Sequence, residues 1–399
     1  MTITGSQRVA VLLCKLSDTN GIEPQPVSYY EDLFVKRGTG GVNDYYATAS
    51  LGAINLDGSR VFGWKTLDST LGAYIADHPT RSDKIQGAIA AFPDVVVSDY
   101  AVVVAIFNVG LGDGGSAGGV LCAPGDENVT WLSHEIGHNI GLEHSFDQSA
   151  RQLMSWSQKG EYYDQHDVMS AMNVHGDTGH QFSPRGPLLN VANLQRMEWM
   201  PANRVWRPPS SNSSGVYEID LVALSHPDTP GYLAADVNGL VVEFRIPDGF
   251  DAGVPRPAVL IHEPADPNST VVASDPASFN NEWQPGQTFD ATTQLLGQTG
   301  GLRLTIVSFD LRRMIARLRV GVMAVRPPFH HQTPLYALGP GGTLVELVGG
   351  KIHRVPMPDP RLVSLIEALA PKLEEQPVLA EQAWLFEGLA ESRHKLRGV

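Results

Sequence analysis

The most constraining feature of the sequence is the eleven-residue stretch HEIGHNIGLEH, at residues 134–144. On a helix, His134 and His138 lie one turn apart on the same face, so both imidazoles can bind one cation. Glu135 lies beside them and can reach a water molecule on that cation without being a ligand. Gly141 lets the chain leave the helix with a dihedral that other residues resist, so His144 can return as a third ligand.

Three neutral imidazoles and one open position are typical of a catalytic zinc site, so we expect one catalytic Zn²⁺ as the cofactor. The alternative is an amphipathic helix whose histidines merely face solvent. The fixed offsets of the glycine and of the third histidine favour the metal site, because the longer motif arises less often by chance.

This motif is similar to that of the metzincin zinc metallopeptidases, in which H-E-x-x-H-x-x-G-x-x-H is followed by a Met-turn. Met169 supplies the downstream methionine, and Met172 is a less favoured alternative. More finely, the chain resembles the immune-inhibitor-A and gametolysin-like families over about residues 8–265. The supporting matches are Tyr46-x-x-x-Ser50-x-Gly52, Gly63-Trp64, Asp167–Ser170, Leu240–Arg245 and Val259–His262.

The resemblance implies a zinc-dependent endopeptidase that acts on a protein or peptide substrate. It also implies an α/β metzincin-like catalytic domain with a mixed sheet, an active-site helix and the Met-turn. Met169 would then form an apolar base beneath the metal. Families with a tyrosine ligand place it two residues after this methionine, and because Ala171 stands there we expect no metal-bound tyrosine.

The reaction expected of this site is peptide hydrolysis by metal-activated water. Zinc lowers the pKa of its water, while Glu135, as general base, takes the proton and passes it to the departing amine. Four residues are candidates for oxyanion or substrate contacts by proximity in sequence only, with structural or surface roles as the alternative: Tyr162, Tyr163, His166 and His175.

Two other functions stay open at the level of sequence. One is a catalytically weak zinc-binding protein that serves in interaction or adhesion through residues 216–399. The other is a zinc hydrolase that acts on non-protein amides. The presence of Glu135 favours an enzyme, because a scaffold needs no general base.

Two further segments concern binding near the motif. Residues 116–122 are suitably extended to bind a peptide by strand addition, with an ordinary loop as the alternative. The acidic residues Asp113, Asp126 and Glu127 could bind calcium, but no EF-type ligand spacing is present. Solvated turn carboxylates are therefore favoured, and calcium is not indicated.

The strand and helix signals predict three parts. Residues 1–208 form the α/β catalytic domain, residues 209–323 an antiparallel β-sandwich-like domain, and residues 324–399 a small α+β segment of unknown role. A Pro/Ser/Asn-rich stretch at 202–214 suggests the first boundary. The last part is expected to hold a hairpin around Gly349-Gly350 and helices near 362–369 and 378–393.

Within the first part, local patterns predict individual elements. Val9–Leu16 and Ala101–Phe107 are apolar runs typical of buried strands. Helices are expected over Arg81–Phe92, where apolar residues repeat at helical spacing, and from about Asn128 to Ile140. Asp57-Gly58, between two strand-like runs, predicts a β-hairpin.

Composition limits the remaining possibilities. The 29 basic and 43 acidic residues give a net charge of −14, which argues against a nucleic-acid partner. The longest apolar run is far too short to span a membrane.

Cys14 and Cys122 could form at most one disulfide, and small buried hydrophobes are the favoured alternative. No signal peptide is visible, so as written the chain is expected in the cytoplasm, although the resembled families are typically secreted. The oligomeric state is left open.

Overall fold

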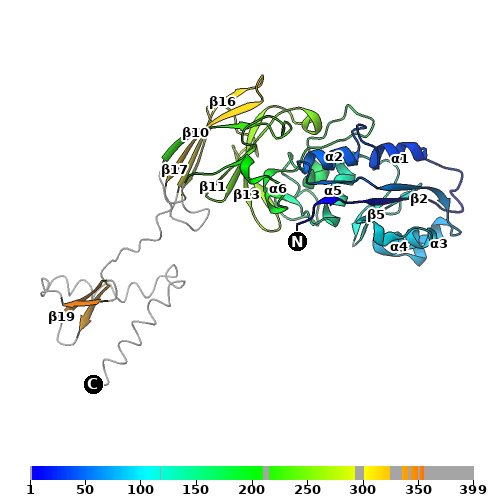
Figure 1. Cartoon of the computed structure of the whole chain (residues 1–399). Helices are drawn as coiled ribbons and strands as arrows, with labels where there is room; N and C mark the ends of the chain where they lie inside the picture. The colour runs from blue at the N-terminus through cyan, green and yellow to red at the C-terminus, as the bar shows by residue number, and fades with distance from the viewer. Residues whose placement is uncertain are drawn as a thin grey trace. The chain divides into compact units, whose positions relative to one another are not determined.

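The computed structural model describes residues 2–116, 118–209, 215–292 and 301–323, together with three strands between 335 and 354 (Figure 1). The chain divides into two compact units, residues 1–325 and 326–399. In the second unit, the antiparallel sheet consists of β18 (Leu335–Gly339), β19 (Thr343–Val348) and β20 (Lys351–Arg354). The pairing of β19 with β20 matches the hairpin predicted around Gly349-Gly350, whereas the two helices predicted after it lie outside the described residues.

The N-terminal part of the first unit is built on a five-stranded sheet in the order β4-β2-β5-β7-β6. The first four strands are parallel, and β6 is antiparallel to β7. The strands are β2 (Val9–Lys15), β4 (Arg60–Thr66), β5 (Val102–Phe107), β6 (Gly114–Ser116) and β7 (Gly119–Cys122). The predicted buried strands correspond to β2 and β5, and both are confirmed.

Helices cover both faces of this sheet, which explains why β2 and β5 are apolar throughout. Figure 1 shows α1 and α2 on one side of β2, with α3 and α4 on the other. Val11 packs in the same core as α1, α2 and α5, whereas Leu12 packs with α3 and α4. The helices are α1 (Val27–Phe34), α2 (Val42–Ala49), α3 (Leu71–Asp77), α4 (Arg81–Ala91) and α5 (Val129–Asn139). The predicted helices over 81–92 and 128–140 are confirmed to within a residue at each end.

The hairpin predicted at Asp57-Gly58 is wrong. The strand before it, β3 (Ile54–Asn55), pairs in parallel with β1 (Gly5–Ser6), and β4 after it pairs in parallel with β2. The turn itself exists, and Gly58 has a φ of 85°. A turn signal predicts only that the chain reverses or bends. Which strands pair is determined by strands that lie far along the chain.

The second part of this unit contains two sheets that share one apolar core, to which Phe244, Ile261 and Leu318 all contribute. A four-stranded antiparallel sheet has the order β10-β17-β16-β15, and a six-stranded sheet has the order β8-β14-β13-β12-β11-β9. The first comprises β10 (Gly215–Val222), β15 (Thr288–Thr292), β16 (Gly301–Asp310) and β17 (Ile315–Met323). The second comprises β8 (Ser145–Asp147), β9 (Val205–Trp206), β11 (Ala234–Val237), β12 (Leu240–Arg245), β13 (Ala258–Pro264) and β14 (Ser269–Val271).

The six-stranded sheet spans the boundary expected near residue 208. Its edge strands β8 and β9 come from the first 208 residues, and each pairs in parallel with a strand of the later segment. The remaining helical segments are short and lie between these elements: η1 (Val97–Asp99), η2 (Val168–Asn173), α6 (Val191–Arg196), η3 (Ala202–Arg204) and η4 (Gly249–Asp251).

A buried ionic group joins the sandwich to the loop that precedes η2. Arg245 on β12 is fully buried, and its Nη1 lies 2.7 Å from the carboxylate of Asp251. Its Nη2 donates to the backbone oxygen of His166 at 2.6 Å. Removing one partner of such a pair leaves an unpaired buried charge, which is costly. The group therefore anchors this loop to the sheet.

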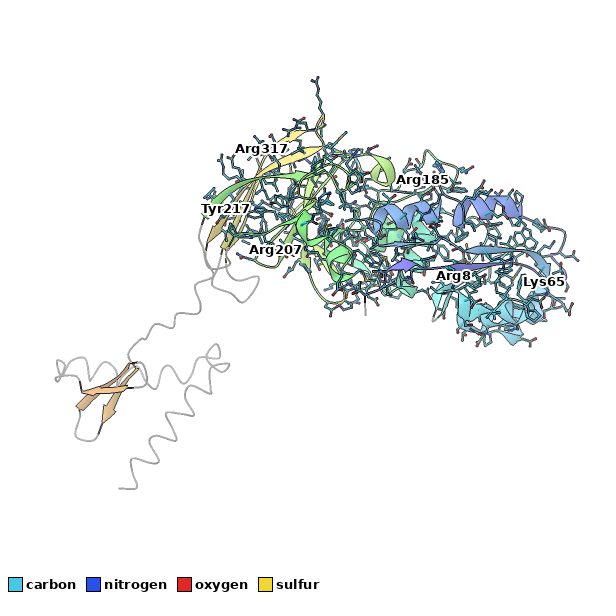
Figure 2. The ribbon with its side chains drawn as sticks, in the orientation of Figure 1. Arg8, Lys65, Arg185, Arg207, Tyr217 and Arg317 are labelled. Carbon is cyan, nitrogen blue, oxygen red and sulfur yellow. The ribbon has the colours of Figure 1, made fainter. Side chains whose placement is uncertain are left out.

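The outer face of the four-stranded sheet carries cross-strand ion pairs. Figure 2 shows Arg317 there, and its Nε lies 2.9 Å from Oδ1 of Asp220. Because these pairs are solvent-exposed, they contribute little to stability and mainly keep this sheet face polar.

Two predictions from composition, on membrane-spanning segments and on the two cysteines, can be compared with the described residues. No helix among them is both long enough and apolar enough to cross a membrane. Cys14 and Cys122 are both buried free thiols. Burial raises the pKa of both thiols, so each acts as a small apolar side chain of the core.

Candidate metal centre

Helix α5 begins and ends with local signals that place its histidines. Asn128 caps the N-terminus, and its Oδ1 accepts a hydrogen bond from the backbone N–H of Trp131 at 2.9 Å. At the other end, Gly141 has a φ of 93°, and the N–H of Leu142 bonds to the oxygen of Gly137 at 2.9 Å. This Schellman motif turns the chain back across the helix end and directs His144 toward the other two histidines.

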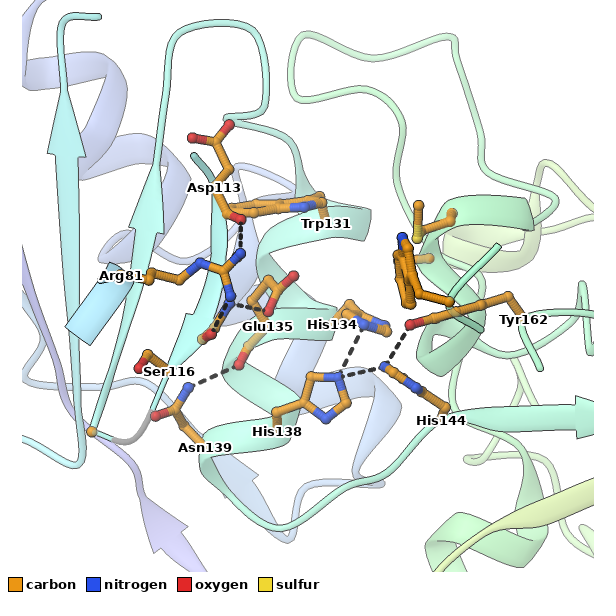
Figure 3. Close-up of a pocket in the computed structure, with 16 residues that line it drawn as sticks. Arg81, Asp113, Ser116, Trp131, His134, Glu135, His138, Asn139, His144 and Tyr162 are labelled. Carbon is orange, nitrogen blue, oxygen red and sulfur yellow. Dashed lines mark hydrogen bonds between the residues drawn. The ribbon is translucent and has the colours of Figure 1, made fainter. Parts of the chain in front are cut away.

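The three histidines of the motif converge on one point (Figure 3). Nε2 of His138 lies 3.0 Å from Nε2 of His134 and 3.0 Å from Nε2 of His144. Bonds of about 2.1 Å to one zinc ion at tetrahedral angles separate two ligand atoms by about 3.4 Å. The observed spacing therefore suits three ligands on one ion.

Each imidazole is oriented by a hydrogen bond from its other nitrogen. Nδ1 of His134 bonds to the oxygen of Val168 at 3.1 Å, and Nδ1 of His138 bonds to the oxygen of Leu142 at 2.9 Å. Nδ1 of His144 bonds to Oε1 of Glu161 at 2.6 Å. Since these acceptors assign the protons to Nδ1, three Nε2 lone pairs face one another, an arrangement that fits a cation.

Burial favours the neutral form of His134 and His138. Desolvation lowers the pKa of His134 well below its ordinary value, and the neighbouring imidazoles lower it further. The pKa of His138 is lowered for the same two reasons. Neutral imidazole is the form that binds a metal ion.

Glu135 lies in the same cleft but outside the group of three ligand atoms. Its Oε2 accepts a hydrogen bond from the backbone N–H of Gly115 on β6. Burial raises the pKa of Glu135, while His138, the Gly115 N–H and Arg81 oppose the rise. A carboxylate whose pKa is shifted toward neutrality is suited to exchange protons.

Of the four candidates for oxyanion or substrate contacts, the structure brings only Tyr162 to the histidines. Its hydroxyl lies 3.1 Å from Nε2 of His144, as Figure 3 shows. The ring of Tyr163 instead packs against the guanidinium of Arg151, whose central carbon lies 4.0 Å from the centroid of that ring. His166 and His175 do not line the cleft and lie together elsewhere, with ring centroids 5.0 Å apart.

Met169, the residue expected in the Met-turn, is fully buried beneath α5. A Cβ added to Gly137 would lie 2.9 Å from Met169 Sδ, so the methionine packs directly against the helix between the two histidine turns. The carboxylate of Asp167 caps this segment by accepting from the N–H of Met169 at 2.9 Å. Met172, the alternative, is 46% exposed and lines the cleft.

The cleft has a volume of about 770 Å³ and two unlike walls. On one side lies β6, whose Gly115 carbonyl accepts from Nη1 of Arg81 at 2.9 Å. On the other side are Met172 and Trp156, which is 66% exposed. A polar backbone wall opposite an apolar one is suited to an extended chain with side chains.

The expectation that residues 116–122 form the exposed edge is corrected. β7 lies between β5 and β6, so its backbone is paired on both sides. The edge strand is β6, at Gly114–Ser116, and its Gly115 already bonds to Glu135 and Arg81. The strand and loop alternatives could not be separated by sequence, because the glycine pairs at 114–115 and 118–119 give no strand signal.

The acidic residues that could bind calcium, but for which solvated turn carboxylates are favoured, are Asp113, Asp126 and Glu127. In the described ranges they do not form a group of three converging ligands. Glu127 bonds instead to the hydroxyl of Tyr30. Burial, together with the neighbouring Asp126, raises the pKa of Asp113 to about 7.

Sequence reasoning missed Glu161, Arg81 and Trp156. Glu161 precedes Tyr162 directly, and an acidic residue close to a tyrosine candidate was the only signal that pointed to it. Arg81 and Trp156 reach the cleft through the fold, and no local pattern identifies them. Comparison with protein-family models, with curated proteins and with solved structures finds no match to this chain.

Proposed function

We propose that this chain is a zinc-dependent endopeptidase with a metzincin-type centre. The observation that carries the proposal is the convergence of three Nε2 atoms, each imidazole held through Nδ1, beside the partly buried carboxylate of Glu135 in an open cleft. His134, His138 and His144 would hold the ion. A zinc ion there supplies a Lewis acid that activates water and polarises the scissile carbonyl.

Glu135 moves the protons in the proposed reaction. Its raised pKa lets it accept a proton from the attacking water and return it to the departing amine. The Gly115 N–H holds one carboxylate oxygen, which leaves the other to face the reacting water. Glu143, an exposed glutamate of the same motif that lies beyond the end of α5, serves as a control.

Tyr162 is the proposed donor to the oxyanion. Its hydroxyl lies at the edge of the histidine group, and burial raises its pKa above the ordinary value, so it stays protonated as a donor. This role differs from the one expected of a tyrosine two residues after the methionine, where Ala171 stands.

Peptide binding is proposed along β6. A strand added to this edge would lie beside Gly115, whose carbonyl is held by Arg81 and whose N–H is held by Glu135. Trp156 and Met172 on the opposite wall would contact side chains of the substrate. The proposed substrates are therefore extended protein segments and peptides.

The test is incubation of the purified chain with a peptide library and an unfolded protein, with cleavage followed by mass spectrometry. We expect cleavage that a chelator abolishes and zinc restores. Glu135→Gln should retain zinc and lose about 10³-fold or more in kcat, whereas Glu143→Gln should cleave as the wild type does. A zinc-loaded, folded sample that cleaves nothing would favour the interaction or adhesion function of residues 216–399, and cleavage of non-protein amides alone would favour the other hydrolase.

A further inference from the structure

A second group of potential metal ligands lies away from the cleft, at the base of the loop that leads into η2. It consists of His166, His175 and Glu282, and one ligand atom from each lies within 4.8 Å of the others. None of the three lines the cleft. The group draws on two loops flanking η2 and on the loop before β15, so three separate segments meet there.

Three polar atoms of this group are buried and make no hydrogen bond. His166 is 3% exposed and Glu282 is 6% exposed. Within the described part of the chain, neither ring nitrogen of His166 makes a hydrogen bond, and neither does Oε1 of Glu282. His166 Nε2 lies 3.4 Å from that oxygen without hydrogen-bond geometry. Buried polar atoms without a hydrogen-bond partner are rare in native proteins, and each needs an explanation such as a bound ion.

The surroundings fix the side chain of Glu282 and the backbone of the two histidines. The other carboxylate oxygen of Glu282 bonds to Nε of Arg256, which keeps Oε1 turned toward the histidines. The backbone oxygen of His166 accepts from the buried Arg245. His175 is fixed by its backbone N–H, which bonds to the oxygen of Gln165 at 2.9 Å. Such outer contacts orient metal ligands in known sites.

The donor set indicates the kind of ion. Two imidazoles and one carboxylate suit zinc, whereas calcium and magnesium prefer oxygen ligands alone. Ligand atoms on one zinc ion are about 3.4 Å apart. His166 Nε2 and Glu282 Oε1 already lie 3.4 Å apart, and the His175 nitrogen lies within 4.8 Å of its two partner atoms, so a small inward movement completes the set. Side-chain rotation in His175, which is only partly buried, provides part of that movement.

We infer that His166, His175 and Glu282 form a second zinc site with a structural role, independent of the proposed catalytic ion. The site joins the segment that carries Met169 to the sandwich. Its occupancy would hold the floor of the cleft against the later sheets, because His134 bonds to Val168, two residues beyond His166.

Zinc stoichiometry of the full chain tests the inference. The protein is stripped with a chelator, reloaded with zinc chloride, desalted, and measured by atomic emission. We expect two zinc ions per chain for the wild type, and one each for Glu282→Gln, for His175→Gln and for His138→Ala. His226→Gln, which changes a partly buried histidine outside both groups, should retain two. X-ray absorption of the His138→Ala sample should show nitrogen and oxygen ligands around its remaining ion.

The outcomes separate this site from the catalytic one. A wild type with one ion that His138→Ala removes, and that Glu282→Gln and His175→Gln retain, would overturn the inference. One ion retained in His138→Ala but lost in Glu282→Gln would support it while contradicting the proposed catalytic site. If the two cluster variants fail to fold, the His138→Ala count decides, and zinc should raise the melting temperature of that variant by roughly 5 °C.

Discussion

At the scale of single residues, the proposed reaction depends on groups whose protons are set by burial and by their neighbours. His134 and His138 are kept neutral, Glu135 is shifted toward neutrality, and Tyr162 stays protonated. The three ligand positions were predictable from sequence because their spacing lies within one helix and its terminal turn. Glu161 was not predictable, since it meets His144 from 17 residues away through the path of a loop.

Tyr162→Phe tests the oxyanion role. Removing a hydroxyl that would stabilise the oxyanion of the transition state should lower kcat by about 10²-fold to 10³-fold with little change in KM. Zinc content should stay unchanged, because the three histidines are untouched. Tyr163→Phe, which alters a ring packed under Arg151, should leave kcat at the wild-type value. A Tyr162→Phe enzyme with full kcat would contradict the assignment.

The carboxyl of Asp113 predicts a pH dependence of stability. Its pKa in the fold is raised from 3.8 to about 7, so the folded chain holds this proton more tightly than the unfolded chain. The stabilisation is complete below pH 3.8 and is lost as the pH rises through 7. Asp113→Asn should therefore raise the melting temperature at pH 8 by about 2–4 °C relative to its effect at pH 4. The exposed control Asp94→Asn should shift the melting temperature equally at both pH values. An Asp113→Asn shift that is equal at pH 4 and pH 8 would argue against the raised pKa of Asp113.

At the scale of elements, close packing between α5 and η2 explains the glycine in the middle of the motif. A methyl group at Gly137 would lie 2.9 Å from Met169 Sδ and 3.4 Å from Leu142 Cδ1. Elements with strong local signals, such as α5 with its cap and terminal glycine, were predictable from sequence. The partner of β4 was not, because parallel pairing is determined by strands far along the chain.

Gly137→Ala tests this packing. The added methyl should lower the free energy of unfolding by about 1–3 kcal/mol relative to Gly72→Ala, measured by urea denaturation. Gly72 is a fair control, since it also lies in a helix but an added Cβ meets nothing within 4 Å. Equal stability of the two variants would show that Met169 moves aside at no cost.

Arg81 tests the role of the β6 wall. Its guanidinium bonds to the backbone oxygens of Gly112, Asp113 and Gly115, so one side chain holds the whole approach to the edge strand. Arg81→Ala should raise KM for a cleaved peptide by roughly tenfold with zinc content unchanged. Arg312→Ala, an exposed arginine in the turn between β16 and β17, should leave KM unaltered.

At the scale of the whole molecule, the first compact unit extends well past the boundary expected at residue 208. The composition change at 202–214 was visible in the sequence, but the parallel pairing of β8 and β9 with later strands was not. Edge strands of two and three residues carry too little pattern to be assigned to a sheet. The sequence also gave no sign that His166 and Glu282 would meet, because they lie more than a hundred residues apart.

Truncation tests how the molecule divides. A chain ending at residue 208 leaves β8 and β9 without partners and exposes the apolar faces of the missing sheets, so it should be unfolded or aggregated by circular dichroism and size-exclusion chromatography. A chain ending at residue 325 should keep the wild-type melting temperature and zinc content, because residues 1–325 form a compact unit of their own. If the 325-residue chain cleaves peptides faster than the full chain, residues 326–399 restrain activity; equal rates would exclude such a restraint.

The third histidine of the motif is followed immediately by β8, and β8 is hydrogen-bonded to β14 in the six-stranded sheet. His144 therefore leaves the other two ligands whenever that sheet opens. In moderate urea, the rate at which a coloured chelator captures the proposed catalytic ion should follow the opening rate of the sandwich. Metal transfer would then be a kinetic probe of a region that takes no part in the chemistry.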